Sequence, residues 1–230
     1  MQLHTDLSQR VVLTPDQHQW VDSPMPGVSR LMLDRAGAET ARATSLVRYA
    51  AGAGYHPHTH GGGEEILVLS GVFSDEYGDY PAGTYLRNPP GSRHTPFSRE
   101  GCELLVKLWQ FNATDQQTLV LTSQSTAFLP GLVPGLSVLP LHQHDGVQTA
   151  LVRWAPHTQF NRHVHVGGEE ILVLEGCFYD EFGDYPAKSW LRNPAYSQHQ
   201  PFTRDEGALI YVKTGFIGAG FLGDAWLTPA

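Results

Sequence analysis

The sequence predicts an all-β protein made of two tandem copies of one domain. The 230 residues are enough for two domains of about 110–120 residues each. The second half of the chain repeats the first, identically in several stretches. Segments between turn-forming residues are short and rich in Val, Ile, Leu, Thr and aromatic residues, and none shows the 3.6-residue apolar period of a helix.

The two copies are related by a nearly constant spacing of 105 residues. Residues 64–69 recur identically as 169–174, and residues 78–82 recur identically as 183–187. Upstream of these stretches the spacing is 108, so the first copy carries three additional residues in a connection around 36–43. Length variation confined to a connection is typical of a repeated fold and indicates tandem duplication.

Duplication at this spacing predicts a first domain at residues 1–118 and a second at 119–230. The boundary falls within residues 114–126, which form a linker or a short helix. Residues 1–19 are polar and mixed, and we expect an arm or an edge strand there. Strands are expected in the first domain, with counterparts in the second, near residues 44–50, 64–74, 83–88, 94–99 and 103–110.

The composition argues against several classes of partner. The net charge is −8 and the chain has no cluster of Lys and Arg, so it lacks the positive surface that binds nucleic acid or an anionic membrane. No apolar run approaches the roughly 20 residues that span a bilayer, and the first residues do not resemble a signal peptide. Cys102 and Cys177 are not at equivalent positions of the repeat. We therefore expect a cytoplasmic protein with reduced thiols.

The strongest functional signal is a set of three histidines and one glutamate that occurs once in each copy. Strand alternation places the first two histidines on one face, and glycines let the chain turn before the glutamate. Three imidazoles and one carboxylate directed into a barrel form a site for a divalent transition metal. Duplication alone does not explain the set, because neighbours differ between copies: Thr59 is replaced by Val164. The predicted ligands are His58, His60, Glu64 and His94, then His163, His165, Glu169 and His199.

Both copies resemble the cupin family. The first copy contains the two family motifs as His58-x-His60-x3-Glu64-x6-Gly71 and Gly83-x5-Pro89-x-Gly91-x2-His94. The second copy contains them as His163-x-His165-x3-Glu169-x6-Gly176 and Pro194-x4-His199, with Lys188 and Tyr196 in place of two glycines. The resemblance covers nearly the whole chain after about residue 25. It implies two tandem jelly-roll (cupin) β-barrels, a bicupin.

Within the cupins, residues 63–69, 75–83 and 87–94 are similar to the cupin domain of ChrR-type anti-sigma factors. That resemblance implies a zinc ion on the four ligands of each barrel, up to two per chain, with Fe, Mn or Ni as alternatives. In that family an N-terminal helical domain with a His-x3-Cys-x2-Cys motif binds the sigma factor. This chain lacks the motif, so sigma-factor binding is not expected from its sequence.

Functions of different classes follow from the resemblance. The first is a metal-binding sensor or regulatory protein related to anti-sigma factors. The alternative is a non-haem Fe(II)-dependent dioxygenase, because some related cupins cleave diketones or hydroxyacetophenones. The third is a storage or scaffold protein whose metals only stabilise the fold. Four ligands complete a tetrahedron on zinc but leave two positions on an octahedral ion for a small-molecule ligand and O2. The sequence therefore leaves open whether the chain is an enzyme.

Charged residues beside the motifs have a structural interpretation. Glu65 and Glu170 alternate to the strand face opposite the ligands, and we expect surface or interface charges there. Arg87 is expected to pair with Asp75 or Glu76, and Arg192 with the corresponding acids of the second copy.

The remaining expectations concern the surface. His56 is expected at the rim of the first site, and His142 and His144 at the surface. Residues 216–230 are apolar and Gly-rich and read as a closing or exchanged strand. Both faces of strand 64–69 are largely apolar, which predicts packing of the barrels on each other or on another chain, as in a homodimer.

Overall fold

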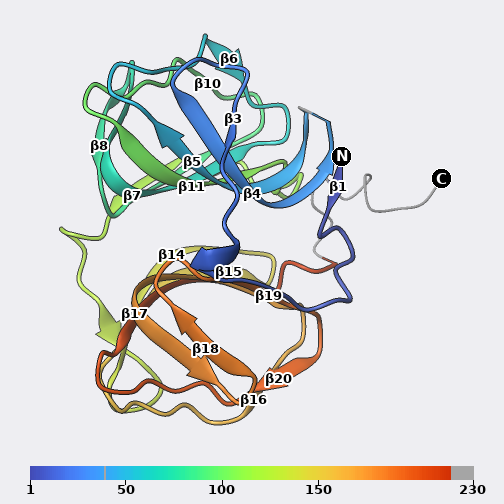
Figure 1. Ribbon diagram of the computed structural model, residues 1–230, viewed down its shortest axis with the longest axis vertical. Helices are drawn as coiled ribbons and strands as arrows, with labels where there is room; N and C mark the ends of the chain where they lie inside the picture. Colours follow the sequence, from blue (N-terminus) through green and yellow to red (C-terminus); the bar gives the residue numbers. More distant parts are fainter. Residues whose placement is uncertain (39, 219–230) are drawn as a thin grey trace. The chain divides into compact units, whose positions relative to one another are not determined.

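The computed structural model describes residues 1–38 and 40–218, so most of the predicted closing strand at 216–230 lies outside the described residues. The chain divides into two compact units (Figure 1). Of the described residues, the first contains Met1–Thr5 and Gln19–Ser125, and the second contains Asp6–His18 and residues 126–218. Both units are built from strands, which confirms the all-β prediction. No helix of the described chain is long and apolar enough to cross a membrane.

The first barrel has a large sheet in the order β1-β4-β5-β11-β7-β9-β12, with β3 paired to β4 and β8 paired to β7. A two-stranded ribbon, β10-β6, completes it. The strands are β1 (Gln2–Leu3), β3 (Val21–Asp22), β4 (Val28–Gly37), β5 (Ala41–Tyr49), β6 (His58–Thr59), β7 (Glu64–Asp75), β8 (Gly78–Pro81), β9 (Thr84–Asn88), β10 (Arg93–His94), β11 (Cys102–Leu108) and β12 (Leu119–Thr122).

The second barrel repeats this topology, except that no described strand corresponds to β1; its order is β13-β14-β15-β21-β17-β19-β2, with β18 paired to β17 and a ribbon β16-β20. A 3-10 turn, η1 (Pro15–Gln17), follows β2. The strands are β2 (Val11–Leu13), β13 (Leu129–Pro130), β14 (Leu136–His144), β15 (Val147–Trp154), β16 (His163–His165), β17 (Glu169–Asp180), β18 (Gly183–Pro186), β19 (Trp190–Asn193), β20 (Ser197–His199) and β21 (Ala208–Thr214).

The edge strands depart from the sequence-based boundary. β12 follows residue 118, yet it pairs with β9 of the first barrel. β2 belongs to the N-terminal arm, yet it pairs with β19 of the second barrel (Figure 1). The registers are equivalent, because Leu119 faces Arg87 and Val11 faces Arg192. The strand that precedes each repeat in the chain therefore pairs in the barrel of the other repeat: β2 in the second and β12 in the first. Residues 119–122 form a strand instead of a linker or helix.

Two further elements differ from the expectation. The strand expected at 94–99 is reduced to β10 and isolated bridges at Phe97, and β4 was not expected as a strand. The three additional residues of the first copy lengthen the hairpin rather than its loop alone: both arms and the connection between β4 and β5 are one residue longer than in β14 and β15.

The outward faces of the sheets contain buried charges, which corrects two expectations. Glu65 is 2% exposed and pairs with Arg87, whose Nη1 lies 2.9 Å from Glu65 Oε1. Arg87 also pairs with Asp115 and stacks over the Phe111 ring at 4.1 Å. Arg87 therefore does not pair with Asp75 or Glu76. In the second barrel Glu170 is 3% exposed and accepts a bond from Trp190 Nε1, and Arg192 Nη2 donates to the Asp6 carbonyl at 3.0 Å.

The cysteines and three histidines outside the motifs lie mostly where they were expected. Both cysteines are free and buried. His56 is exposed, as expected of a rim residue. His142 and His144 are half-buried, with ring centroids 6.4 Å apart in a stacked arrangement, so the expected surface position is only partly correct.

Replacing Arg87 with Met tests the buried ion network. The change removes the Arg87 cation from the buried carboxylates of Glu65 and Asp115, and we expect the free energy of unfolding to fall by about 3–5 kcal/mol. Arg99→Met is the matched control, because its pair with Asp79 is exposed and is worth at most about 1 kcal/mol. Urea denaturation measures both. Equal losses in the two variants would contradict the assignment.

Candidate metal centres

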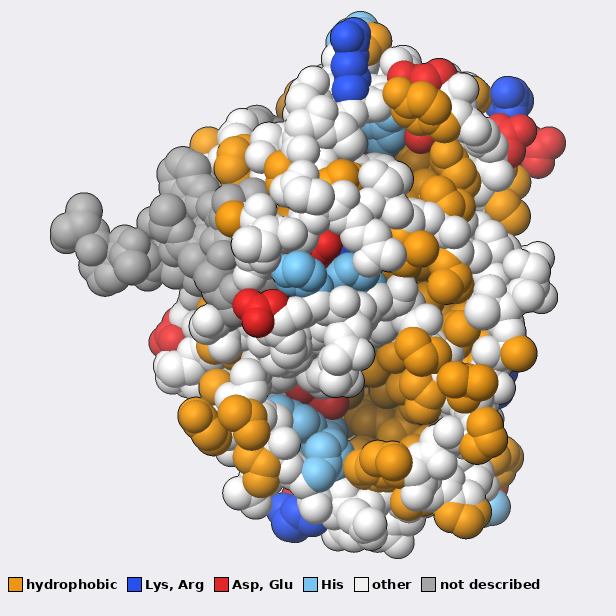
Figure 2. Space-filling model, turned by 180° about the vertical axis from the view of Figure 1, so that it is seen from behind, with side chains coloured by type: hydrophobic (Ala, Val, Ile, Leu, Met, Phe, Trp, Pro, Cys, Tyr) orange, Lys and Arg blue, Asp and Glu red, His pale blue; other side chains and the backbone are white. Residues whose placement is uncertain are grey.

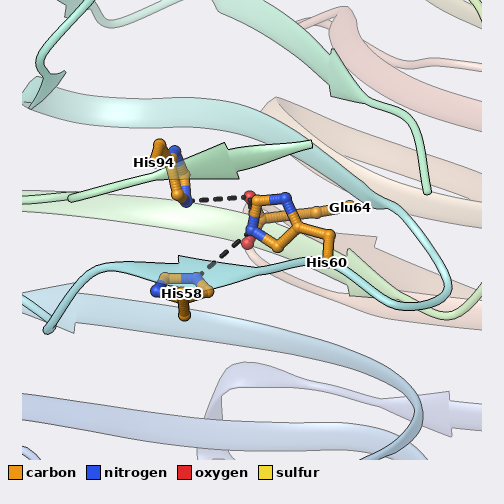
Figure 3. Close-up of side chains that lie close together, drawn as sticks. All are labelled: His58, His60, Glu64 and His94. Atoms are coloured by element: carbon orange, nitrogen blue, oxygen red, sulfur yellow. Dashed lines mark hydrogen bonds and ion pairs between the residues drawn. The ribbon is translucent and has the colours of Figure 1, made fainter. Parts of the chain in front are cut away.

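Each barrel brings together the four residues of its motif. In the first barrel His58 lies on β6, Glu64 begins β7, His94 lies on β10, and His60 directly follows β6. The ribbon pairs His94 with His58. The four donor atoms lie within 4.8 Å of one another, as a group that could hold a metal ion (Figure 3).

The first cluster is compact and mostly buried. His60 Nε2 lies 3.2 Å from His58 Nε2 and 3.2 Å from Glu64 Oε2. His94 Nε2 lies 3.5 Å from the same carboxylate oxygen. His60, Glu64 and His94 are buried, whereas His58 is half-buried and marks the more open side of the cluster.

A glycine turn brings Glu64 to the histidines. A Cβ on Gly62 would lie 2.3 Å from the Trp109 ring, and one on Gly63 would lie 2.3 Å from the Phe111 ring. Gly63 also has a φ of +76°, in the left-handed region that favours glycine. The two aromatic rings pack directly on the turn, so a larger residue there would displace Glu64.

Hydrogen bonds behind the cluster hold each ligand. Every histidine Nδ1 is engaged by the protein, so Nε2 is left facing the other ligands. Glu64 Oε2 accepts a bond from Asn88 Nδ2 at 3.1 Å. The Nδ1 contacts are His58 to the carbonyl of His56 at 2.9 Å, His60 to Ser92 Oγ at 3.0 Å, and His94 to Asp75 Oδ2 at 3.3 Å.

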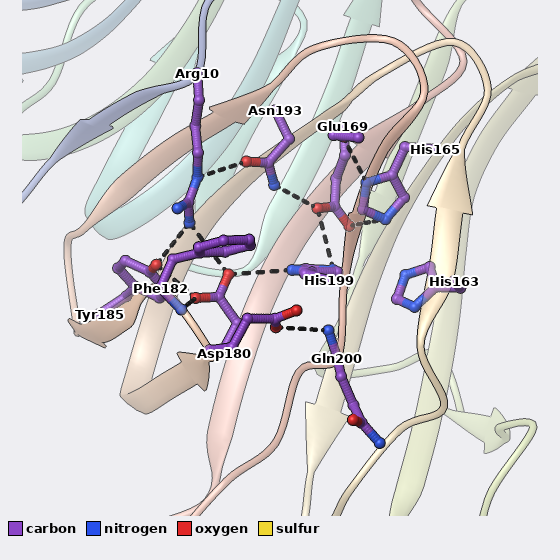
Figure 4. A network of polar contacts seen from close by, with 12 residues as sticks. Arg10, His163, His165, Glu169, Asp180, Phe182, Tyr185, Asn193, His199 and Gln200 are labelled. Carbon is purple, nitrogen blue, oxygen red and sulfur yellow. Dashed lines mark hydrogen bonds and ion pairs between the residues drawn. The ribbon is translucent and has the colours of Figure 1, made fainter.

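The second cluster has the same construction on β16, β17 and β20 (Figure 4). His165 Nε2 lies 3.4 Å from Glu169 Oε1, and His199 Nε2 lies 3.6 Å from Glu169 Oε2. The supporting bonds join His163 Nδ1 to the carbonyl of Asn161 at 2.9 Å, His165 Nδ1 to Ser197 Oγ at 3.3 Å, His199 Nδ1 to Asp180 Oδ2 at 3.2 Å, and Asn193 Nδ2 to Glu169 Oε2 at 2.9 Å.

The two glycines missing from the second motif do not alter the backbone. Lys188 and Tyr196 adopt φ values of +74° and +62°, close to the +83° and +86° of Gly83 and Gly91. A residue with a Cβ in this region costs roughly 1–2 kcal/mol. The second barrel therefore keeps the ligand geometry at some cost in stability.

Several inward-facing ring nitrogens have no hydrogen-bond partner within the described chain. They are Nε2 of His94, His165 and His199, all buried. A buried polar atom left unsatisfied costs about 1–3 kcal/mol. Imidazole nitrogens together with a carboxylate are the donor set of a divalent transition ion. The residues of both clusters therefore fit such an ion.

Burial also sets the protonation of two ligands. It lowers the pKa of His60, and it lowers the pKa of His165 to about 4, against the opposing charges of Glu64 and Glu169. Both imidazoles are thus neutral at pH 7, the form that binds a metal. Burial also disfavours charge on His94, but the bond to Asp75 and the charge of Glu64 outweigh it and raise the pKa of His94.

The supporting residues were missed at the level of sequence. Asp75, Ser92 and Asn88 recur at the repeat spacing as Asp180, Ser197 and Asn193. Identity at the repeat spacing is the signal that could have found them. It did not single them out, because many core residues are repeated equally well.

The cavities beside the two clusters differ in size. The first barrel encloses about 560 Å³ lined by all four ligands and by Tyr49, Tyr55, Ile66, Phe73, Leu104 and Val106. The second encloses about 170 Å³, lined by three of its ligands and almost entirely by apolar side chains. Figure 2 shows histidine side chains beside a hollow of hydrophobic side chains in the second barrel.

Comparison with known proteins identifies the family. Residues 8–112 and 116–217 each match the ChrR cupin-like domain. The chain belongs to this family. It is a bicupin, and the predicted pair of tandem cupin barrels is confirmed. No curated protein matches the chain.

Solved structures share the fold at low sequence identity. A candidate dioxygenase from Nostoc punctiforme is 15% identical, with a TM-score of 0.73 and coverage of 92% of this chain and 84% of that one. A nickel(II)-bound pirin from Escherichia coli is 14% identical, with a TM-score of 0.64 and coverage of 90% and 99%. Oxalate decarboxylase from Lactobacillus farciminis is 14% identical, with a TM-score of 0.62 and coverage of 90% and 86%.

Counting bound metal tests the two clusters. Metal-free protein should take up two equivalents of Co²⁺, and His94→Ala and His199→Ala one equivalent each, because each change removes a ligand from one barrel. The double variant should bind none. His157→Ala is the control, since that side chain is exposed and outside both clusters. Elemental analysis after dialysis gives the count, and two equivalents retained by the double variant would contradict the ligand assignment.

Proposed function

We propose that the first barrel is a metal-dependent catalytic centre of the cupin dioxygenase type, and that the second barrel holds a structural ion. The observation that carries this proposal is the cavity of about 560 Å³ that reaches all four ligands of the first cluster. A cavity of this size accommodates a small organic molecule, whereas about 170 Å³ in the second barrel leaves little room for one.

The walls of the first cavity suit a flat, largely apolar substrate with a polar group. Tyr49 and Tyr55 contribute phenols, where the second barrel has Trp154 and Phe160. Burial raises the pKa of Tyr49 well above its ordinary value, with a further contribution from Glu64. Its hydroxyl therefore stays protonated and is available to donate a hydrogen bond to a substrate oxygen. A diketone or hydroxyacetophenone has this combination of features.

The protein's part in the reaction is to bind, orient and exclude water. When bound, a redox-active divalent ion supplies Lewis acidity and one-electron chemistry towards O2. The rings of Phe73 and Tyr49, with centroids 6.1 Å apart, form an apolar part of the cavity wall. His94 lines the same cavity. Tyr55 donates to Ser23 Oγ at 3.0 Å, which fixes its ring near His58. The likeness to a candidate dioxygenase supports the proposal at the level of the fold.

Membership of the ChrR cupin-like family favours a second candidate, a zinc-binding sensor or regulatory protein. In that case the ligand of the first cavity would be a signal rather than a substrate. Metal identity separates the two candidates, because zinc supplies no redox chemistry whereas iron does. Protein purified without added metals and containing iron in the first barrel would favour the enzyme.

Oxygen uptake tests the proposed activity. Iron-loaded protein should consume O2 with pentane-2,4-dione or a hydroxyacetophenone, His94→Ala should abolish uptake, and His199→Ala should retain it, because the cavity beside the second cluster, as far as the described residues line it, leaves little room for the substrate. No uptake with iron present in both barrels would contradict the proposal.

A variant that narrows the first cavity distinguishes an effect on substrate binding from an effect on the amount of bound metal. Ser45 lines the first cavity, and Ser45→Leu should lower kcat/KM about tenfold or more while the bound iron stays unchanged. The corresponding change in the second barrel, Ala150→Leu, should leave kcat/KM unchanged. Steady-state oxygen-electrode kinetics compare the two variants, and an equal effect of both would argue against the first cavity as the substrate site.

A further inference from the structure

The N-terminal arm is part of the second barrel. Residues Asp6–His18 cluster with that unit, and β2 pairs with β19 from Val11 opposite Arg192 to Leu13 opposite Trp190. Arg192 Nη2 donates to the carbonyl of Asp6 at 3.0 Å. Arg10 lies between these two attachments, immediately before β2, with its side chain 28% exposed.

The guanidinium of Arg10 contacts the residues that support two of the metal ligands. Its Nη2 lies 3.1 Å from Asp180 Oδ2 and 2.6 Å from the Tyr185 hydroxyl, and its Nε donates to Asn193 Oδ1 at 2.9 Å (Figure 4). The Arg10 guanidinium also stacks over the Phe182 ring at 4.7 Å. Because the guanidinium is rigid and planar, Arg10 donates to the Asp180 carboxylate and to the Asn193 amide at the same time.

Both recipients act directly on ligands. Asp180 Oδ2 accepts from His199 Nδ1 at 3.2 Å as well as from Arg10. Asn193 Nδ2 donates to Glu169 Oε2 at 2.9 Å. Because Arg10 donates to the amide oxygen, the amide nitrogen is turned towards Glu169. Arg10 thus fixes the orientation of the supports of one imidazole and of the carboxylate.

The first barrel has the recipients but not the arginine. Asp75, Tyr80 and Asn88 occupy the positions of Asp180, Tyr185 and Asn193 at the repeat spacing. The strand registers of β2 and β12 align Arg10 with Thr118, which is exposed. The contact between an arginine of the edge-strand segment and the supporting residues is therefore specific to the second cluster.

We propose that Arg10 is a positioning residue of the second metal centre, through which docking of the N-terminal arm sets the metal affinity of that centre and not of the first. The inference rests on the metal binding proposed above. Removing a residue that is hydrogen-bonded to a metal ligand changes metal affinity about 10–100-fold, and Arg10 orients two such residues, Asp180 and Asn193.

Affinity measurements in single-site backgrounds test this role. His94→Ala leaves only the second centre and His199→Ala leaves only the first. Co²⁺ affinity is measured in each by competition with a chromophoric chelator, without any assay of activity. In the His94→Ala background, Arg10→Met should weaken Co²⁺ binding by about 10–100-fold. Arg10→Lys should restore part of the loss, because an ammonium can replace the contact with Asp180. In the His199→Ala background, Arg10→Met should have no effect.

Val12→Ala is the structural control in the same backgrounds. Val12 packs against the core of the second barrel from β2 and makes none of the side-chain hydrogen bonds of Arg10. It should lower the melting temperature of the metal-free protein without changing Co²⁺ affinity. An Arg10→Met affinity equal to that of its parent, or an equal loss in Val12→Ala, would overturn the proposal. Absence of Co²⁺ binding by the His94→Ala parent itself would instead overturn the second metal centre, and the inference with it.

Discussion

Asp75 accepts a hydrogen bond from His94, and Asp180 accepts the equivalent bond from His199. These bonds, with those of Asn88 and Asn193 to the two glutamates, hold one imidazole and the carboxylate of each barrel. Separate bonds to the other two histidines of each cluster complete the convergence on a common point. Convergence of buried donors is unfavourable without an ion, because inward nitrogens such as His94 Nε2 have no hydrogen-bond partner among the described residues. The rest of each site depends on this arrangement, since a bound ion would repay the burial of its ligands.

The two barrels hold the same ligands but surround them differently. In the first, the chain leaves a cavity of about 560 Å³ with two phenols in its wall. In the second, larger apolar groups such as Trp154 line a cavity of about 170 Å³, and Arg10 supports the ligands from the N-terminal arm. Duplication with divergence of this kind allows one site to bind a ligand while the other stabilises the fold. The two sites differ in the volume of the adjoining cavity and in the contacts from Arg10, and not in the identity of their ligands.

Much of this architecture could be predicted from the sequence, because the repeat spacing and the His-x-His-x3-Glu motif are local patterns. The edge strands could not, since pairing of β2 with β19 joins segments about 180 residues apart in sequence. The partners of Arg87 were also missed. Asp115 lies outside the strands expected from the sequence, and Glu65 was expected to be a surface or interface charge on the strand face opposite the ligands. The volume of each cavity depends on side chains from several strands at once, so it could not be predicted from the motif alone.

X-ray absorption at the metal edge tests the central claim most directly. With iron or Co²⁺ in the His199→Ala variant, so that only the first centre is filled, we predict a first shell of three imidazole nitrogens and one carboxylate oxygen, with additional light-atom ligands from solvent. In the His94→Ala variant only the second centre is filled, and we predict that its first shell also contains three imidazole nitrogens and one carboxylate oxygen. A first shell with fewer than three imidazoles in either variant would contradict the account.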